Sequence, residues 1–531
     1  MKARALIVAA AAVALAHSLW VGAVTDDAGI ALAYARTFAS GEGLRLTALS
    51  PRVEAYSDPL WVLWLSLGYV LRVGGAQFAH VSGAAFGALA VLFAGWVPSR
   101  AEGREVRALD AIAPWVLALD TTYNFWAGAG LESGAFALAL SLSLAFAGAL
   151  PAGLLAVLRP EGAVYAALLA PFRRPMVRWL AVAALPALAW LAFRRIYYGQ
   201  WLPNAWYAKK QWDYGGLAYL RSWFFADPWH WALLLTPLAL LSPRTRRAAL
   251  LCASACAAAV VFIAVSRGDW MAEHRFVAHA LPAAAVAAGL VPLALDDLFR
   301  QRALAVAAAL ALGGAAFTGA WTRSPARQKD PVLPLAYISE QGRWFRQEAQ
   351  RLGLTRPRVA HFDIGGVALE SGGEVIDLAG LADLYIGRVG YQAQDRVRDY
   401  VFGEVKPEFI NIHGPCRYLR DDVRLARDYR LAATGLWGEN WERAEGRCSL
   451  PADLLQALQK STPAQARDLW LCARSHLSAG QLPDVRPLAA RLADQGLRLG
   501  DRDLLEAAVT LDPTLVRAAQ RLLTLRLVRP R

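Results

Sequence analysis

The sequence is poor in cysteine and in charged residues. Five of its 531 residues are cysteine, no two of them are spaced as CxxC, and no histidine or cysteine pattern has the spacing of a structural zinc site. Charged residues make up 19% of the chain, whereas hydrophobic residues make up 56%. With a mean hydropathy of +0.30, the chain is too apolar for an array of soluble domains. We therefore expect a membrane protein without a structural zinc.

Long hydrophobic runs predict the membrane crossings. The first run, residues 5–24, follows Lys2 and Arg4 and is about 20 residues long, which is enough to cross ~30 Å of hydrocarbon. A cleaved signal peptide is the alternative, but the run is longer than a usual signal core and many further runs follow it. These further runs are residues 78–97, 109–123, 134–150, 179–197, 229–241, 248–265, 279–295 and 303–321.

Two apolar regions are too short for straight crossings. Residues 151–158 and 162–171 flank the tip sequence RPEG, and together they predict a broken hairpin whose tip is buried in protein or lines a wet cavity. Residues 59–71 predict a helix that lies at the membrane surface or inserts halfway. With the hairpin counted as two crossings, we expect eleven.

Basic residues predict the orientation. The short stretches 1–4, 98–108, 172–178, 243–247 and 296–302 hold 13 Lys and Arg in 34 residues, whereas the opposite loops hold 8 in 91. The positive-inside rule therefore places the N-terminus in the cytoplasm, and an odd number of crossings places the C-terminus outside. The net charge of +13 needs no nucleic-acid partner, since much of it anchors cytoplasmic loops against anionic lipid.

The last part of the chain is more polar. We expect a mainly α, polytopic membrane domain at residues 1–321, an outer α/β domain at 322–450 and a helical segment at 451–531. Short strands are predicted within residues 356–370, 374–381 and 408–413, with helix between them. Cys416 and Cys448 lie in this α/β domain, where an oxidising compartment would let them pair.

Two adjacent acids follow the first hydrophobic run. Thr25 or Asp26 can cap the helix that begins here, which is the structural interpretation. However, Asp26 and Asp27 both stand at the expected outer end of a span, and one cap does not require two carboxylates. We therefore take the doublet as the first candidate for catalysis.

Every other expected outer loop also carries charge. Structural roles are the alternative: a solvated turn around Tyr56, mutual pairing in the RPEG tip, and an aromatic belt with snorkelling lysines at 197–216. Transfer of a sugar from a lipid phosphate needs a carboxylate base and cations that stabilise the departing phosphate, and these loops supply both. The candidates for substrate binding are Glu54, Tyr56, Glu132, Arg159, Glu161, Asn204, Lys209, Lys210, Asp269, His274 and Arg275.

A series of motifs in one order carries a resemblance to a known family. They are DDA followed by YAR and GEG, VEAYSDPLW, GLES, RPEG, GQWLPNAWYAK, GDWM with RF downstream, and DIGGVALESGGEVIDLAGLAD, between residues 20 and 390. The sequence resembles membrane glycosyltransferases of the GT-C class, most of all the terminal arabinofuranosyltransferases of actinobacterial cell walls and their relatives. The final 140 residues carry no part of this resemblance.

The resemblance implies a hexosyl- or pentosyltransferase of the bacterial inner (plasma) membrane. Its donor would be a polyprenyl-phosphate sugar, its acceptor a surface glycan, a lipid or a protein, and its active site would face outward. The resemblance makes Asp27 or Asp26 the general base and places Asp363 among the substrate-binding residues. Some relatives use a divalent metal at the doublet, so the resemblance does not decide whether this protein binds a divalent metal at Asp26 and Asp27. Ala28 and Gly29 depart from the relatives' pattern, and the donor sugar is therefore not implied.

A transporter or flippase of lipid-linked sugars is the alternative function. The broken hairpin would then act as a gate, like the discontinuous helices of transporters. Transporters place their charged residues near the membrane midplane and often carry inverted repeats. This sequence shows no inverted repeat, and its charges lie in the outer loops, so we favour the glycosyltransferase.

Overall fold

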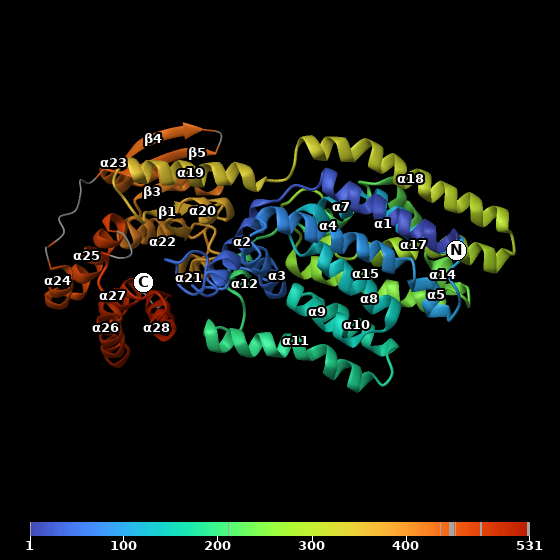
Figure 1. The fold of residues 1–531 in the computed structure, drawn as a ribbon, viewed down its shortest axis with the longest axis horizontal. Helices are drawn as coiled ribbons and strands as arrows, with labels where there is room; N and C mark the ends of the chain where they lie inside the picture. The colour runs from blue at the N-terminus through green and yellow to red at the C-terminus, as the bar shows by residue number, and fades with distance from the viewer. Residues whose placement is uncertain are drawn as a thin grey trace. The chain divides into compact units, whose positions relative to one another are not determined.

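The structure, a computed structural model, describes residues 2–210, 212–435, 437–444, 451, 453–477 and 481–527 (Figure 1). The chain forms two compact units. The first consists of residues 1–28, 57–190 and 212–334, and the second consists of residues 29–56, 191–211 and 335–531. The second unit therefore includes two segments from the N-terminal half. The expected boundaries after residues 321 and 450 do not coincide with this division.

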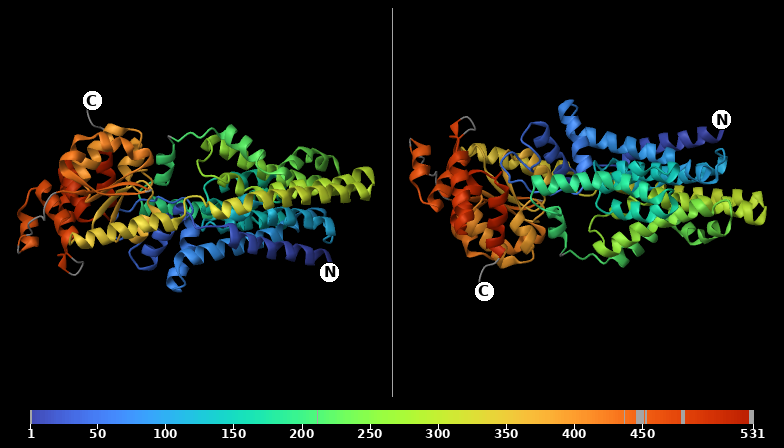
Figure 2. Two further views of the ribbon diagram at one scale, coloured as in Figure 1. Left: turned by 90° about the horizontal axis from the view of Figure 1, so that it is seen from above. Right: turned by 90° about the horizontal axis from the view of Figure 1, so that it is seen from below.

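The first unit is helical. Figure 2 shows two of its helices, α1 and α18, running lengthwise along it. Two helices cross the unit boundaries: α2 (Asp26–Ala39) and α11 (Met176–Tyr197). The other helices of this unit are α1 (Lys2–Val21), α3 (Pro59–Val70), α4 (Gly75–Ala94), α5 (Val97–Glu102), η1 (Ala108–Ala111), α6 (Ile112–Leu119), α7 (Thr121–Gly128), α8 (Ser133–Phe146), α9 (Ala149–Leu158), α10 (Gly162–Leu169), η2 (Ala170–Phe172), α13 (Gly216–Phe224), η3 (Pro228–Leu235), α14 (Pro237–Leu241), α15 (Arg246–Ser266), α16 (Arg275–Ala278), α17 (Leu281–Phe299) and α18 (Arg302–Lys329).

Six helices of the described chain are long and apolar enough to span a membrane, and the pair α7 and α8, bent by 116°, would make a seventh. The six are α1, α4 continued to Glu102, α11, α15, α17 and α18. The expected eleven membrane crossings are not confirmed, because fewer helices of the described chain are long enough to span a membrane. The runs at 109–123, 151–158, 162–171 and 229–241 instead form shorter apolar helices or parts of them. Asp120 divides the first of these runs, because its carboxylate accepts the backbone N–H of Tyr123 and begins α7.

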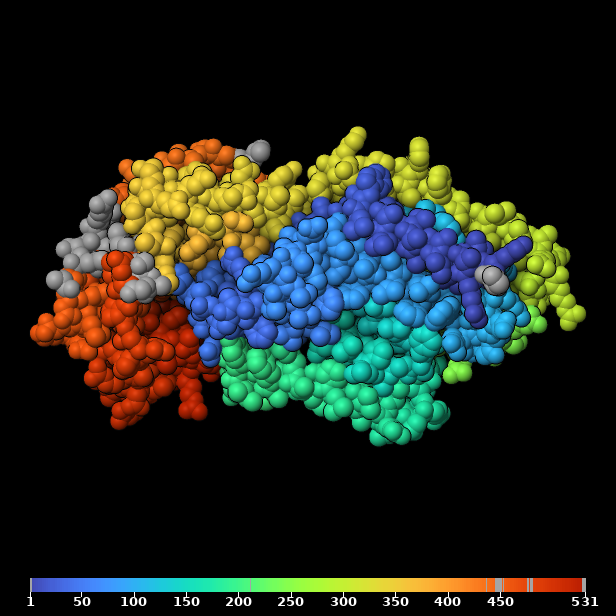
Figure 3. All heavy atoms as spheres, viewed as in Figure 1, coloured from blue at the N-terminus to red at the C-terminus, as the bar shows by residue number. Residues whose placement is uncertain are grey.

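The short helices predicted from the sequence are present. The segment that begins at Pro59 is the 12-residue helix α3, and α9 and α10 flank Arg159 as the two arms of the broken hairpin. Small residues let neighbouring helices approach closely. A Cβ atom added to Gly134 of α8 would lie 2.1 Å from the carbonyl oxygen of Gly83 in α4. In Figure 3, the atoms of α1 (dark blue) lie along the surface of the first unit beside those of α4.

The second unit contains a five-stranded sheet with the order β2-β1-β3-β5-β4. The predicted strands β1 (Arg358–His361), β2 (Glu374–Asp377) and β3 (Phe409–Ile412) are confirmed and pair in parallel. The hairpin of β4 (Tyr429–Gly435) and β5 (Gly438–Arg443) was not predicted, since most residues of β4 are exposed and lack a hydrophobic pattern. The helices of the second unit before residue 445 are α12 (Asn204–Lys209), α19 (Leu335–Arg351), α20 (Gly365–Glu370), α21 (Leu384–Val389), α22 (Gln394–Arg398), η4 (Asp399–Val405), η5 (Gly414–Asp421) and α23 (Val423–Asp428), in addition to the parts of α2 and α11 that lie in it.

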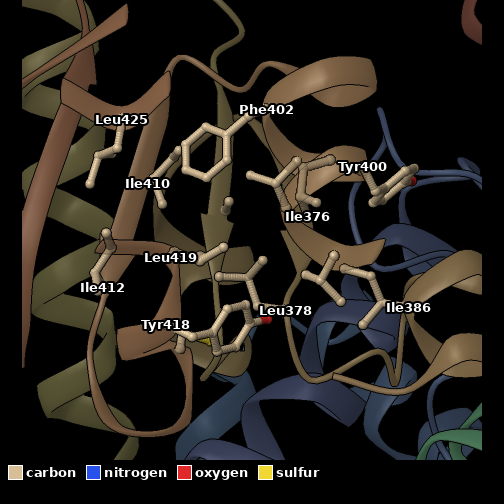
Figure 4. Packing of buried hydrophobic residues seen from close by; sticks show 14 of the residues in the cluster. Ile376, Leu378, Ile386, Tyr400, Phe402, Ile410, Ile412, Tyr418, Leu419 and Leu425 are labelled. Carbon is tan, nitrogen blue, oxygen red and sulfur yellow. The ribbon is translucent and has the colours of Figure 1, made fainter. Parts of the chain in front are cut away.

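A hydrophobic core joins the sheet to the helices of the second unit. Ile376, Ile410 and Ile412 point from the strands toward Phe402 and Leu419, as Figure 4 shows. The predicted helical tail is confirmed as α24 (Leu454–Lys460), α25 (Pro463–His476), α26 (Arg486–Leu499), α27 (Arg502–Leu511) and α28 (Val516–Leu527). Leu523 of α28 belongs to the same core, which explains why the tail is not a separate unit.

Cys416 does not form the disulfide with Cys448 that the sequence allows. Cys416 is a free, fully buried thiol, and burial raises its pKa well above the ordinary value. Cys448 lies outside the described residues. Cys416 is therefore a packing residue of the core shown in Figure 4.

Candidate active site

The aspartate doublet begins α2. Asp26 is 2% exposed, and its backbone N–H donates to the carbonyl oxygen of Leu333 at 3.0 Å. Thr25 forms an isolated antiparallel bridge with Pro334. Both acids lie in the first turn of the helix, where the helix dipole stabilises a negative charge. These backbone contacts fix the segment that carries Asp27. Among the described residues the buried hydroxyl of Thr25 has no hydrogen-bond partner, so Thr25 does not cap the helix.

Asp27 is paired with a distant arginine. Nη1 of Arg275 donates to Oδ2 of Asp27 at 2.6 Å, and Nε of the same guanidinium donates to Oδ2 of Asp269 at 2.9 Å. The side chains of Arg275 and Asp269 are 5% and 4% exposed, whereas that of Asp27 is 27% exposed. One buried cation thus binds two carboxylates, and of the three side chains only that of Asp27 is substantially exposed. A carboxylate in this position can accept a hydrogen bond from an incoming hydroxyl group.

A second buried ion-pair cluster lies in the same unit. Arg159 forms a hydrogen-bonded ion pair with Glu161, as the sequence suggested, and its Nη1 also donates to Glu132 at 2.6 Å. Nδ1 of His279 lies 3.8 Å from Glu161. Burial, followed by the charge of Glu132, raises the pKa of the nearby Asp58 well above the ordinary value. This cluster accounts for the acid in the GLES motif, which is costly at a membrane boundary unless it has a partner.

Phe276 connects the two clusters. The guanidinium carbon of Arg159 lies 5.3 Å from the centroid of its ring, and that of Arg275 lies 5.4 Å from it. Both distances are within the range of cation–π contacts. The structure thus brings five of the expected substrate-binding residues together with Asp27 of the doublet: Glu132, Arg159, Glu161, Asp269 and Arg275.

His274 has a different environment from that of its neighbour Arg275. Its Nε2 lies 2.8 Å from the hydroxyl oxygen of Ser222, and its ring meets that of Tyr219 edge-on. Burial lowers the pKa of His274 to about 4. The ring is therefore neutral at neutral pH and acts as a hydrogen-bonding partner rather than as a cation.

Six expected residues belong to the second unit, and five of them lie in its two N-terminal segments. Glu54 forms an ion pair with Arg194, and the hydroxyl of Tyr56 lies 3.0 Å from that of Tyr198. The side-chain amide of Asn204 donates to the carbonyl oxygens of three residues between 380 and 383, at 2.9 to 3.0 Å. Lys209 ends α12. Lys210, at the C-terminal end of α12, is exposed.

Asp363 lies at the carboxyl end of β1, which is the edge where ligands bind to many parallel sheets. Its Oδ2 lies 2.8 Å from Nε2 of His413, which follows β3, and the other ring nitrogen of His413 bonds to Asn411. The backbone N–H of Asp363 donates to Nδ1 of His361 at 3.0 Å. The two histidines were not predicted from the sequence, although both lie at or just beyond the end of a predicted strand.

The helix that begins with the doublet packs against the segment that follows Asp363. A Cβ atom added to Gly29 would lie 2.9 Å from the Cα atom of Gly365, so α2 and α20 meet without room for a side chain. Further along α2, the guanidinium of Arg36 donates to the carbonyl oxygens of Ala368, at 2.8 Å, and Leu369. This close contact explains why glycine stands at position 29, where the family resemblance fails.

The residues do not fit the divalent metal that the resemblance left open. In the part of the chain that the structure describes, no group of three or more His, Cys, Asp or Glu side chains is arranged to hold a metal ion. Moreover, the guanidinium of Arg275 occupies one oxygen of Asp27, and a second cation at that oxygen would be repelled by it.

An apolar cavity of about 310 Å³ lies close in sequence and structure to the Arg275 segment. Its lining includes Val277 and Ala280, which are two and five residues after Arg275. The remaining lining residues come from α13, η3, α14, α15 and α17 and from Thr236 between η3 and α14, and nearly all of them are hydrophobic. The cavity offers a hydrocarbon-like environment.

Comparison with known proteins identifies the architecture. Residues 334–459 match a family described as a domain of unknown function (DUF8728), and no curated protein matches the chain. Crystal structures of ArnT from Cupriavidus metallidurans are similar in the apo state and bound to undecaprenyl phosphate, with TM-scores of 0.54 and 0.55. Both are 16% identical to this chain and cover 82% of it and 97% of their own length.

An archaeal oligosaccharyltransferase is also similar. AglB from Archaeoglobus fulgidus, in complex with an inhibitory peptide and a dolichol-phosphate, has a TM-score of 0.50, is 12% identical and covers 84% of this chain and 75% of its own length. These likenesses show the fold. With the long apolar helices of the described chain, they make the chain a multi-pass membrane protein with a GT-C fold, as the ordered motifs lead us to expect.

Proposed function

We propose that this protein is a glycosyltransferase that moves a sugar from a polyprenyl-phosphate donor to a glycan, lipid or protein acceptor on the outer face of the bacterial inner membrane. The observation that carries the proposal is the partly exposed carboxylate of Asp27, held by the buried guanidinium of Arg275. Similar structures contain undecaprenyl phosphate or dolichol-phosphate, which supports a lipid-linked donor. Because the resemblance does not identify the donor sugar, donors that carry a pentose and donors that carry a hexose are both to be tested.

In the proposed reaction, Asp27 is the general base. Its carboxylate takes the proton of the acceptor hydroxyl while the hydroxyl oxygen forms a bond to the anomeric carbon of the donor sugar. The bond between that carbon and the phosphate oxygen breaks, and its electron pair leaves with the polyprenyl phosphate. Asp26 fixes the first turn of α2 and orients its neighbour.

Cations would stabilise the departing phosphate. Arg275 is placed for this role because it shares its charge with Asp27, and protonation of Asp27 during the reaction would free part of that charge for the phosphate. We extend the same role to Arg159, whose guanidinium contacts the same phenylalanine ring as that of Arg275. For Lys209 and Lys210 of the second unit, the role in donor binding stays a prediction from the sequence. The apolar cavity of about 310 Å³ beside α16 would hold part of the isoprenoid tail.

Acceptor binding would involve the second unit. Asp363 presents a carboxylate at the carboxyl end of β1, and its hydrogen bond to His413 fixes its orientation. Carboxylate and imidazole groups can each bond to a sugar hydroxyl. Glu54, Tyr56 and Asn204 would act by holding the two N-terminal segments of this unit in place.

Proteoliposomes that contain the purified protein and a polyprenyl-phosphate sugar test the proposal. A glycosyltransferase releases polyprenyl phosphate and labels the acceptor, and the Asp27→Asn variant should bind the donor without doing either. A transporter or flippase, the alternative, would move intact donor between leaflets without releasing phosphate. That outcome, with equal movement by Asp27→Asn, would reject the proposed function.

A further inference from the structure

The segment before Arg275 has an unfavourable backbone conformation. Glu273 and His274 are consecutive residues with φ angles of +61° and +47°, between α15 and α16. Residues other than glycine rarely adopt such angles, because the Cβ atom crowds the backbone carbonyl oxygen. Two in succession persist only where the surrounding contacts fix the conformation, and such positions cluster at functional sites.

The side chain of Glu273 supplies the first of these contacts. It is 9% exposed and forms an ion pair with Arg323, and its other oxygen lies 3.3 Å from Nε of Arg327. The hydroxyl of Thr122, a fully buried residue of α7, donates to the same carboxylate at 3.0 Å. Two arginines from the last turns of α18 and one hydroxyl from α7 thus hold a single carboxylate.

The backbone on either side of Arg275 is held as well. The carbonyl oxygen of Glu273 accepts a hydrogen bond from Nε1 of Trp126 at 2.6 Å, and the N–H of Phe276 donates to the hydroxyl of Tyr219 at 3.1 Å. The ring of Trp126 also lies beneath the guanidinium of Arg275, 5.8 Å from centroid to carbon. The same tryptophan therefore contacts both the turn and the side chain that the turn directs.

We propose that Glu273 is a positioning residue for the ion pair between Arg275 and Asp27. Its carboxylate, clamped by Arg323 and Arg327, keeps the turn in its left-handed conformation, and the turn aims the guanidinium at Asp27. The inference rests on the proposed function, in which Asp27 is the base. The ion-pair partners of Glu273 are Arg323 and Arg327, so Glu273 acts on the pair of Arg275 and Asp27 through the turn.

A purely structural role would be to attach α18 to α7. The two roles differ in whether the effect of Glu273 depends on Arg275. A double-mutant cycle measures this dependence. Glu273→Gln keeps the shape of the side chain and removes its charge, so the ion pairs with both arginines are lost.

The first measurement is sugar transfer by the full-length protein. We expect Glu273→Gln to reduce kcat on the order of 10- to 100-fold, as for a displaced catalytic group, with little change in the KM for the donor. Glu273→Gln combined with Arg275→Gln should be no slower than Arg275→Gln alone, because the turn then has no guanidinium to direct. Losses that multiply, or a wild-type kcat in Glu273→Gln, would overturn the proposal.

A matched control uses an exposed ion pair near the same turn. Asp213 and Arg267 lie 3.3 Å apart with side chains 57% and 59% exposed. Asp213→Asn makes the same chemical change as Glu273→Gln and should leave kcat unchanged. If Glu273→Gln does not fold, Arg327→Gln removes only the longer of the two ion pairs and should lower kcat in the same way to a smaller extent; an unchanged kcat in that variant would contradict the clamp.

Hydrogen exchange gives a result that does not depend on activity. The amides of residues 268–276 should exchange faster in Glu273→Gln than in the wild-type protein, while those of α4 and α17 stay protected. Unchanged exchange in the turn would reject the positioning role even if transfer were slower. Failure of the wild-type protein to transfer any sugar would reject the proposed function, and the exchange result would still decide whether Glu273 fixes the turn.

Discussion

Nη1 of Arg275 lies 2.6 Å from Oδ2 of Asp27, although the two residues are 248 positions apart in the chain. Arg275 is buried between this carboxylate and that of Asp269. The pair has two consequences: it fixes the most accessible acid of the site, and it makes Arg275 a partner of carboxylates as well as a candidate for the lipid phosphate.

The first prediction concerns the doublet. Asp27→Asn should fold and bind donor but lose sugar transfer by ~10²-fold or more, because the general base is removed. Asp26→Asn should have a milder effect, at a cost of about 1 kcal/mol of local stability if the residue mainly begins the helix. Transfer assays with both purified variants measure this. Wild-type transfer by Asp27→Asn would refute the assignment, and an inactive Asp26→Asn alone would exchange the two roles.

The second prediction concerns Arg275 and Asp269. Arg275→Gln should lower the free energy of unfolding by about 3–5 kcal/mol, since the buried carboxylate of Asp269 loses its cation. It should also weaken donor binding. Adding Asp269→Asn should restore part of the stability, because no buried charge is then left alone. Thermal unfolding in detergent and donor binding measure the two effects. Equal unfolding temperatures for the wild-type and Arg275→Gln proteins would contradict the prediction.

The third prediction is a pH dependence of stability. Burial lowers the pKa of His274 from 6.5 in the unfolded chain to about 4, so the unfolded state binds its proton first as the pH falls. The stability that this residue contributes is complete above pH 6.5 and is lost as the pH falls from 6.5 to about 4. Tm should fall over this range more steeply in the wild-type protein than in His274→Gln. Parallel curves for the two proteins would exclude the effect.

The fourth prediction concerns the packing of α2 on α20. A methyl group at position 29 would lie 2.6 Å from Cδ1 of Leu335 and 2.9 Å from Gly365. Gly29→Ala should therefore destabilise the second unit by about 1–3 kcal/mol, as overpacking does. Gly313→Ala in α18, where no atom lies within 4 Å of the added Cβ, is the control and should be neutral or slightly stabilising. Equal stability of both variants would show that α2 shifts without cost.

The fifth prediction concerns orientation. Glu105 is exposed in the loop after α5, and the side chain of Asp395 in the second unit is 96% exposed. A cysteine at position 105 should react with an impermeant label only from the cytoplasm, and one at position 395 only from outside. Labelling of both from the same side would reject the expected topology and the outward-facing site.

Much of the fold follows from local sequence. Apolar runs as long as the hydrocarbon is thick predict α1, α4, α11, α15, α17 and α18, because a spanning helix must satisfy its backbone within one segment. Alternation and turn residues predict β1, β2 and β3. The ion pair of Arg159 with Glu161 is local as well, since the two residues are separated by one proline. The start of α2 at the doublet could be predicted as well, because acidic residues are favoured in the first turn of a helix.

Tertiary structure decided the rest. The sequence indicated that residues 29–56 form an outer loop, but only packing decides that they join the second unit. A glycine such as Gly29 does not show in the sequence which distant residue it packs against. From the sequence, Asp27 and Arg275 are each a charged residue in an expected outer loop. Their pairing, and the turn at Glu273 that directs it, depend on helices that meet across some 250 residues of chain, and local periodicity and charge contain no information about such contacts.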